Sequence, residues 1–208
     1  PTLACGVEHG LRGDVDATMA TLHAFNQWLD EDWGFDREGR VIGVPMLSLA
    51  DPQAAIAEID WVTARGARVV HVRPAPVPGA LKPRSLGDPL HDPVWARLAE
   101  AGVPVGFHLS DSGYNQIAGL WGGKSSFEGF GARDPLDQVL VDDRAIHDTM
   151  ASMIVHGVFT RHPKLKAVSI ENGSYFVHRL IKRLKKSANN APYHYKEDPI
   201  EQLRSKVW

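Results

Sequence analysis

The sequence predicts an α/β protein whose parallel sheet is covered by helices. Short apolar segments alternate along the chain with amphipathic helical segments, which is the pattern of successive βα units. The strand segments are apolar at nearly every position, as in strands that are buried on both faces. Two architectures fit this order: an open doubly wound sheet and a barrel of eight βα units. Only four complete strands and the beginning of a fifth can be counted, so a barrel would be present only in part.

The composition is that of one ordinary globular domain, residues 1–208. Hydrophobic residues make up 43% of the chain, and 23 basic against 25 acidic side chains give a formal charge of −2. This balance gives no reason to expect a nucleic acid or a membrane surface as a partner. The single cysteine, Cys5, excludes an internal disulfide. No apolar run reaches the roughly 18 residues of a membrane helix and no signal peptide is visible, so we expect a cytoplasmic protein.

The first predicted elements carry clear boundary signals. A helix can be capped by Asp14 or Asp16, has apolar residues at helical spacing, and ends at Gly34. Residues 41–49 form an uninterrupted apolar segment that predicts a buried strand. The pair Asp51-Pro52 then starts a second helix, because aspartate caps it and proline fits its first position.

The middle of the chain repeats the same pattern. Residues 69–73 predict the second strand, and a connection rich in proline and glycine follows at about residues 74–90. Another Asp-Pro pair at residues 92–93 starts a helix that ends at Gly102. Residues 103–109 predict the third strand, so a second complete βα unit lies here.

The last part begins with a long connection. Residues 110–141 are expected to form a loop, and a loop of this length on the catalytic face of a barrel is often a lid. A helix is predicted at about residues 143–159 and the fourth strand at residues 166–170, followed by a basic helix from near Ser174. A short helix at residues 199–204 then leads to Val207 and Trp208, which open one further strand.

His108 is the sharpest candidate for a functional side chain. In both architectures the site lies at the carboxyl ends of the strands, and His108 stands near the end of the third strand. Alternation turns it away from Val105 and Phe107, hence toward a barrel interior. Neutral imidazole is the commonest protein ligand of divalent metals, so His108 is a candidate metal ligand. The alternative is a structural histidine bonded to a nearby carbonyl group.

Glu171 stands at the end of the fourth strand and is the candidate catalytic residue. A carboxylate in a barrel mouth can transfer protons or bind a metal. It could instead cap the helix that starts near Ser174, a position for which Asn172 also competes.

Substrate contacts are expected from side chains around these two residues. Arg73 follows the second strand, where its guanidinium suits a carboxylate substrate, although it could equally pair with a strand-end acid. The other candidates for substrate binding share a position at a strand end or in the predicted lid; they are His71, Asn172, Tyr114 and Trp121. The lid also contains Phe127 and Phe130, which could cover a ligand or pack against the rim or a partner subunit.

Three segments carry a resemblance to a known family. Residues 103–111 (VPVGFHLSD), 157–166 (GVFTRHPKLK) and 171–173 (ENG) resemble the amidohydrolase-related family of metal-dependent barrels. That family includes aminocarboxymuconate-semialdehyde decarboxylase and related aromatic acid decarboxylases. The likeness is most specific in residues 150–208 and weaker over nearly the whole chain.

The resemblance implies a distorted (β/α)8 barrel with a divalent metal, often zinc, at the strand ends. The family ligands are a His-x-His pair on the first strand, a histidine on the fifth and an aspartate on the eighth, and His108 matches the fifth-strand histidine. A histidine commonly ends the sixth strand, where this chain has Glu171. The sequence contains no His-x-His. We therefore expect a partial (β/α)8 TIM barrel, with about strands three to six plus the start of the seventh, and a fragment that is inactive alone.

Two functions follow from these expectations. The first is part of a metal-dependent hydrolase or decarboxylase that acts on a small carboxylate or cyclic substrate, since both reactions occur on this scaffold. The second is a non-catalytic half-barrel that binds a small molecule or a partner chain, including a second copy, because an incomplete barrel leaves strand edges open.

Overall fold

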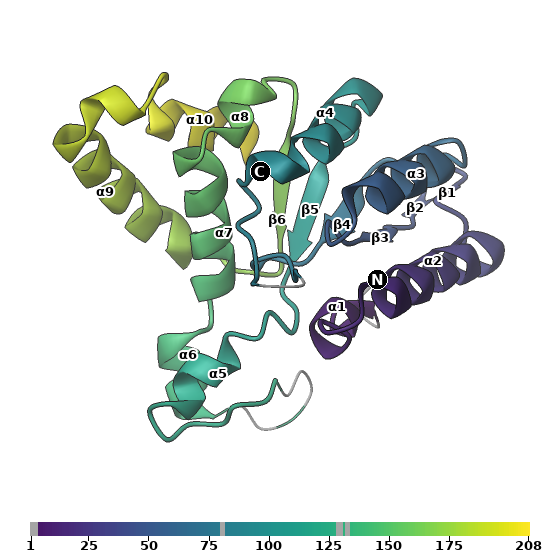
Figure 1. The fold of residues 1–208 in the computed structure, drawn as a ribbon, viewed down its shortest axis with the longest axis horizontal. Coiled ribbons are helices and arrows are strands. Elements are labelled where there is room, and N and C mark those ends of the chain that lie inside the picture. Colours follow the sequence, from purple (N-terminus) through teal and green to yellow (C-terminus); the bar gives the residue numbers. More distant parts are fainter. Residues whose placement is uncertain (1–3, 80–81, 128–130, 132–133) are drawn as a thin grey trace.

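The computed structural model describes residues 4–79, 82–127, 131 and 134–208. Its centre is a parallel sheet in the order β3-β4-β5-β6, shown in Figure 1. The four strands are β3 (Met46–Leu47), β4 (Val70–Val72), β5 (Val105–His108) and β6 (Ala167–Ile170). Each strand lies beside its predecessor in sequence, without the reversal of order that defines a doubly wound sheet. The partial (β/α)8 barrel is therefore confirmed, and the open doubly wound alternative is wrong.

The last residues of the chain pair with β6 where the next strand of the sheet would lie. Val207 bridges to Ala167 in parallel. Ser169 N–H donates to Trp208 O at 2.7 Å, and Trp208 N–H donates to Ala167 O at 3.0 Å. The segment after the last helix therefore continues the sheet on the far side of β6, as its apolar residues predicted.

Helices connect successive strands in the expected positions. They are α3 (Pro52–Thr63), α4 (Asp92–Ala101), α7 (Arg144–Val155), α9 (Tyr175–Asn190) and α10 (Pro199–Lys206). Asp51 caps α3 by accepting from the N–H groups of Gln53 and Ala54 at 2.9 and 3.1 Å. Gly102 ends α4 with a φ of 67°, a left-handed conformation that glycine adopts without a Cβ clash. The Asp-Pro and glycine signals thus act locally as the sequence indicated.

The expected strand at residues 41–49 is wrong in its extent. Val41–Ile42 (β2) pairs antiparallel with Asp36–Arg37 (β1) in an exposed hairpin, and only Met46–Leu47 (β3) joins the main sheet. Gly43 separates the two pieces, and a Cβ there would lie 2.5 Å from Gly34 O. This close approach of the backbone turns the chain, so one apolar run supplies two separate strands.

The N-terminal part contains two helices. The predicted first helix is α2 (Val15–Asp32), and Asp14 caps it by accepting from Ala17 N–H at 2.9 Å. A one-turn helix that the sequence did not predict, α1 (Val7–Gly10), precedes it. Figure 1 shows α1 beside α2, below the sheet. Glu8 of α1 pairs with Arg73, which follows β4, so α1 lies close to the end of that strand.

The long connection after β5 is not a simple loop. It holds two short helices, α5 (Asn115–Gly119) and α6 (Pro135–Leu140), which project together from the body of the molecule (Figure 1). Phe130 lies outside the described residues. The helix expected at residues 143–159 is interrupted: α7 ends before Gly157, whose φ is 72°, and α8 (Val158–Arg161) follows. The short elements η2 (Pro89–His91) and η3 (Pro192–His194) complete the described helices.

The core lies between the sheet and the helices that connect its strands. Its largest fully buried side chains include Trp95 of α4, Phe107 of β5, and Phe159 of α8. Burying one large apolar side chain contributes about 1.5–3 kcal/mol. The pattern of apolar residues thus holds the strand ends at one edge, where the candidate residues lie.

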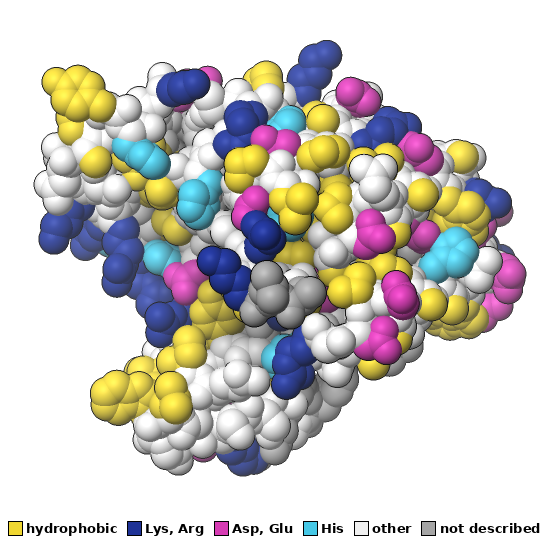
Figure 2. All heavy atoms as spheres, viewed as in Figure 1, with side chains coloured by type: hydrophobic (Ala, Val, Ile, Leu, Met, Phe, Trp, Pro, Cys, Tyr) yellow, Lys and Arg dark blue, Asp and Glu magenta, His cyan; other side chains and the backbone are white. Residues whose placement is uncertain are grey.

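Positive charge is concentrated on the exposed side of α9. Basic side chains gather over α9, along the left edge of Figure 2. The exposed members of this group are Arg179, Lys182, Arg183, Lys185 and Lys186. Their opposite face is apolar and packs through Phe176, Leu180 and Leu184, which is typical of an amphipathic helix with a solvated side. Among the described helices, none has both the length and the apolarity needed to cross a bilayer.

Candidate active site

The adjacent strands β5 and β6 bring His108 and Glu171 together. His108 is the last residue of β5, and its register partner on β6 is Ile170, the residue before Glu171. His108 Nε2 lies 2.9 Å from Glu171 Oε2. The side chain of Glu171 is 66% exposed, whereas that of His108 is 12% exposed. The pair thus joins a sheltered imidazole to a carboxylate that reaches solvent.

The orientation of His108 is fixed by its own backbone. Its Nδ1 lies 2.5 Å from Leu109 O, so Nδ1 carries the proton and donates to this carbonyl group. Nε2 faces Glu171 Oε2, and because a carboxylate oxygen only accepts, this contact is a hydrogen bond when a proton lies between the two atoms. A histidine fixed in this way presents Nε2 as a ligand atom or as a proton acceptor.

His71 lies beside this pair in β4. Its ring and that of His108 are in an edge-to-face arrangement, with centroids 6.3 Å apart. Cys5 Sγ lies 4.0 Å from His71 Nε2. Burial, followed by the effect of His108, lowers the pKa of His71 to about 3, and burial raises the pKa of the Cys5 thiol to about 11. Both groups are therefore neutral near pH 7.

Arg73 is held by a buried carboxylate on α1. Its Nε donates to Glu8 Oε2 at 2.5 Å, and the other oxygen of Glu8 accepts from Ser48 Oγ at 2.5 Å. The two remaining guanidinium nitrogens donate to the carbonyl groups of Ser112 and Pro76 at 2.9 and 2.8 Å. Arg73 thus links α1, β4 and the segment after β5, and its charge is paired inside the protein.

Asn172 joins the ends of the same two strands. Its Nδ2 donates to Phe107 O at 2.7 Å and to Ile170 O at 2.8 Å. These bonds fix the turn that carries Glu171, whose φ of 59° lies in the left-handed region. A non-glycine residue in this region costs free energy and is held by its surroundings.

Tyr114 belongs to a second polar cluster. Its hydroxyl donates to Asp148 Oδ2 at 3.2 Å, while His147 Nδ1 lies 2.9 Å from Asp148 Oδ1. Burial and the charge of Asp148 raise the pKa of Tyr114, whereas bonds from His147 and Tyr114 lower the pKa of Asp148 despite its burial. Tyr114 therefore stays protonated and Asp148 ionised near pH 7.

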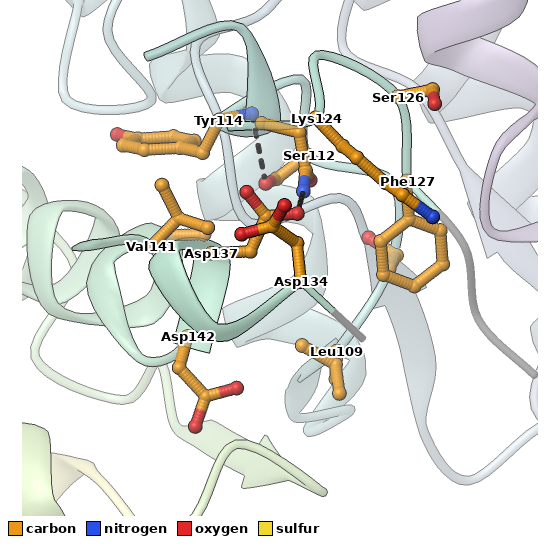
Figure 3. Close-up of a pocket in the computed structure, with 13 residues that line it drawn as sticks. Leu109, Ser112, Tyr114, Lys124, Ser126, Phe127, Asp134, Asp137, Val141 and Asp142 are labelled. Carbon is orange, nitrogen blue, oxygen red and sulfur yellow. Dashed lines mark hydrogen bonds between the residues drawn. The ribbon is translucent and has the colours of Figure 1, made fainter. Parts of the chain in front are cut away.

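Trp121 is not brought to this cluster. It follows α5 and is 74% exposed. A cavity of about 40 Å³, shown in Figure 3, is lined by residues of α5, α6 and the segments beside them, and there Asn115 Nδ2 donates to Asp137 Oδ2 at 2.8 Å. A cavity of this size has room for ordered water but not for a substrate. A wider cleft of about 470 Å³ opens between α1 and the start of α5, with Arg73 and Tyr114 in its lining.

Sequence reasoning missed Glu8 and the contact of Cys5 with His71. Glu8 is separated from Arg73 by 65 residues and Cys5 from His71 by 66, so no local spacing could reveal either pair. A buried arginine at a strand end requires a counter-charge, and this was the one available signal for an acid such as Glu8.

These residues could supply only some of the ligands of a metal ion. His108 and Glu171 have donor atoms that divalent metals accept. Within the part of the chain that the structure describes, however, no three His, Cys, Asp or Glu side chains are grouped so that they could hold a metal ion. The described residues therefore supply part of a ligand set and not a complete one.

A partial barrel with a histidine and a carboxylate at its strand ends places the chain in a class: proteins of the (β/α)8 type with a polar site at the carboxyl edge of the sheet. A sequence model of the family described as Amidohydrolase matches residues 5–191. The chain belongs to this family, as the three segments in its sequence predicted. No protein of curated function matches the sequence.

Solved structures share the fold. An amidohydrolase from Mycobacterium avium subsp. paratuberculosis K-10 is 73% identical with a TM-score of 0.92, and the match covers 100% of this chain and 52% of that one. A 5-carboxyvanillate decarboxylase from Novosphingobium aromaticivorans, complexed with manganese, is 18% identical with a TM-score of 0.69 and coverage of 93% and 53%. A dihydroxybenzoic acid decarboxylase from Polaromonas sp. JS666 with bound manganese is 15% identical with a TM-score of 0.66 and coverage of 94% and 57%. The chain spans about half the length of these structures.

Proposed function

We propose that the chain forms part of a metal-dependent hydrolase or decarboxylase that acts on a small carboxylate or cyclic substrate. Family membership supports an enzyme of the hydrolase or decarboxylase type. The observation that carries the finer proposal is the contact of 2.9 Å between His108 Nε2 and Glu171 Oε2 at the ends of adjacent strands. Active sites of barrel enzymes lie at this edge.

In this proposal His108 is one ligand of a divalent metal, and zinc is the first candidate. Manganese is the metal named for two structural neighbours, so both metals belong in the test. The other ligands would come from barrel strands that this chain does not contain, since it covers 52% of the 73%-identical protein.

Glu171 is proposed as the proton-transfer residue. Decarboxylation breaks a carbon–carbon bond and leaves an electron pair on the carbon, which then takes up a proton. Glu171 can exchange protons with solvent because its side chain is largely exposed, and it lies beside the proposed metal ligand. In hydrolysis the same carboxylate would accept a proton from water.

The remaining candidates are proposed to surround the substrate. His71 borders His108, and Asn172 supports the turn of Glu171. Tyr114 and Arg73 line the cleft beside α1. Trp121 would contact substrate only if the segment with α5 and α6 moved, since its side chain is now exposed.

Metal content after dialysis against zinc or manganese tests the role of His108. The protein measured is the chain joined to the segments of the Mycobacterium avium protein that it does not cover. In it, His108→Ala should bind less of either metal than the unaltered protein, while His178→Ala, a change on the exposed face of α9, should bind as much. Equal metal content in all three proteins would contradict the ligand role.

Activity is tested in a completed barrel. The chain would be joined to the segments of the Mycobacterium avium protein that it does not cover. In this chimera, Glu171→Gln should lower kcat for aromatic carboxylates by about 10²–10⁴-fold and leave the metal content unchanged. An unchanged kcat would remove the proposed proton-transfer role.

A second candidate is a non-catalytic half-barrel that binds a partner chain, such as a second copy. Exposed apolar side chains around α5 and α6 favour it: Leu120 is 85% exposed, Trp121 74% and Val139 78%. Light scattering of the purified chain tests this candidate, because a monomer at all concentrations would contradict self-association through this surface.

A further inference from the structure

The cleft between α1 and the start of α5 is richer in positive than in negative charge. Three arginines line it, Arg12, Arg73 and Arg144, and one carboxylate, Asp148. A concave surface lined mainly by one sign of charge concentrates ligands of the opposite sign. Its volume of about 470 Å³ is within the usual range of sites for small molecules.

The three arginines are not equivalent. Arg73 is buried, and Glu8 pairs with it directly. Its three nitrogens already donate to acceptors of the protein. Arg73 therefore acts on the cleft as a positioning residue, because its bond to Glu8 fixes α1 and hence the segment that carries Arg12.

Arg12 has the least compensated charge. Its one side-chain hydrogen bond among the described residues is donated to His9 O at 2.8 Å. Among the residues that the structure describes, no carboxylate forms an ion pair with Arg12. The remaining N–H groups of this guanidinium are available to a ligand, and guanidinium binds carboxylates through paired hydrogen bonds.

Arg144 retains most of its donors as well. Its Nε lies 3.4 Å from Asp148 Oδ2, a long contact. Asp148 already accepts from Tyr114 and receives a bond from His147. The carboxylate is thus largely satisfied without Arg144, which leaves this guanidinium free to turn toward an anion in the cleft.

Beside polar residues such as Gln116, the lining has an apolar wall. Pro76, Pro78, Pro83 and Ile117 contribute to it, together with Tyr114. Proline has few conformations to lose on binding, and these side chains suit the carbon body of a ligand. The lining thus combines acid-binding groups with an apolar wall, which favours an organic acid over an inorganic ion.

We propose that this cleft is a binding site for an organic carboxylate, in which Arg12 and Arg144 bind the acid group and the proline-lined wall holds the carbon body. The binding site itself does not depend on the proposed function. Only the identification of the bound acid as the substrate rests on it. Ser112 in the cleft follows His108 by four residues, a length of chain that spans at most about 14 Å. The cleft therefore lies in the neighbourhood of His108 along the chain.

Ligand-observed NMR titration of the 208-residue chain with benzoate tests the site without any need for turnover. Benzoate should bind, and Arg12→Gln and Arg144→Gln should each weaken binding by about tenfold, since each removes a charged hydrogen-bond partner. Benzamide, which has the same ring without the charge, and inorganic phosphate should both bind more weakly. Arg40→Gln is the matched control, because Arg40 is an exposed arginine in the turn of the β1–β2 hairpin.

Circular dichroism of each variant establishes that it is folded before it is titrated. Unchanged benzoate affinity in folded Arg12→Gln and Arg144→Gln would overturn the site, as would phosphate binding at least as tightly as benzoate. Equal loss in Arg40→Gln would also overturn it, because binding would then follow net charge. Benzoate binding that survives in His108→Ala of the completed barrel, with metal binding lost, separates this site from the metal proposal.

Discussion

His108 Nε2 lies 2.9 Å from Glu171 Oε2, and the two residues come from the ends of neighbouring strands. The sheet fixes this relationship, since residue 108 is the register partner of residue 170. Asn172 then ties the turn to both strands. Backbone geometry therefore places the two residues side by side at the ends of β5 and β6.

Removing the carboxylate of Glu8 should destabilise the chain strongly. Glu8 and Arg73 are both buried, and Glu8 also accepts from Ser48 Oγ. The variant Glu8→Gln would leave the charge of Arg73 buried without a partner, which costs about 3–5 kcal/mol. Urea denaturation measures this loss in the free energy of unfolding.

The exposed pair of Glu201 and Arg204 provides the control. Glu201→Gln should change the free energy of unfolding by about 0–1 kcal/mol, because solvent screens such pairs. Equal effects of the two substitutions would show that the buried pair stabilises the fold no more than the exposed pair does.

His71 should make the folded chain less stable in acid. Its pKa is lowered to about 3 in the folded state and is near 6.5 in an unfolded chain. Between these values the unfolded state binds the extra proton, so stability is complete above about pH 6.5 and falls as the pH drops toward 3. One such group contributes a slope of about 1.4 kcal/mol per pH unit.

Urea denaturation at several pH values between about 6.5 and 4 tests this dependence. Burial also lowers the pKa of His9 and His91, so the total slope has the same sign in the unaltered chain. His71→Gln should lower the slope by about 1.4 kcal/mol per pH unit, the effect of one proton, whereas His178→Gln on the exposed side of α9 should leave it unchanged. An identical slope in all three proteins would show that His71 is not held neutral by folding.

The sequence predicted the elements whose signals are local. Asp51 caps α3 and Gly102 ends α4 as their positions indicated, because these contacts involve only neighbouring residues. The helices α5 and α6 were missed since they are five and six residues long. Helices of this length are unstable alone and depend on tertiary packing.

The candidate site was predictable only in part, for a related reason. His108 and Glu171 could be located from the strand pattern, since parallel strands end at one edge. The pairing of Arg73 with Glu8 joins residues 65 positions apart. The place of Arg12 in the cleft likewise depends on how α1 packs, so neither could be inferred from spacing.

Gly157 should be required for the break between α7 and α8. Its φ is 72°, where an L residue pays about 1–2 kcal/mol. A Cβ at this position would be 3.6 Å from Arg161 Nη1, an ordinary contact, so the cost of Gly157→Ala comes from the backbone conformation and not from a clash. Thermal denaturation should show a lower Tm for this variant.

Gly10 of α1 is the matched control for that change. Its φ is not positive and a Cβ there meets nothing within 4 Å. Gly10→Ala should therefore leave the Tm unchanged or raise it slightly, because alanine is favoured in helices. A larger loss in Gly10→Ala than in Gly157→Ala would contradict the argument from φ.

The backbone conformation of Glu171 should lower the stability of the fold, while its carboxylate supports activity. Its φ of 59° is unfavourable for glutamate, and glycine adopts this conformation freely. After the greater entropy of an unfolded glycine is subtracted, Glu171→Gly should leave the chain as stable as before or more stable by up to about 1 kcal/mol. Urea denaturation of the variant and kcat in the completed barrel measure the two effects, and kcat should fall.

Glu38 allows the two effects to be separated, because it is the other described non-glycine residue with positive φ, at 58°. It lies in the turn of the exposed β1–β2 hairpin. Glu38→Gly should change stability by a similar amount and leave kcat unaltered. A clear loss of stability in Glu171→Gly alone would mean that the contact of the carboxylate with His108 stabilises the fold by more than the backbone conformation costs. In that case Glu171 would be a structural residue of the strand end.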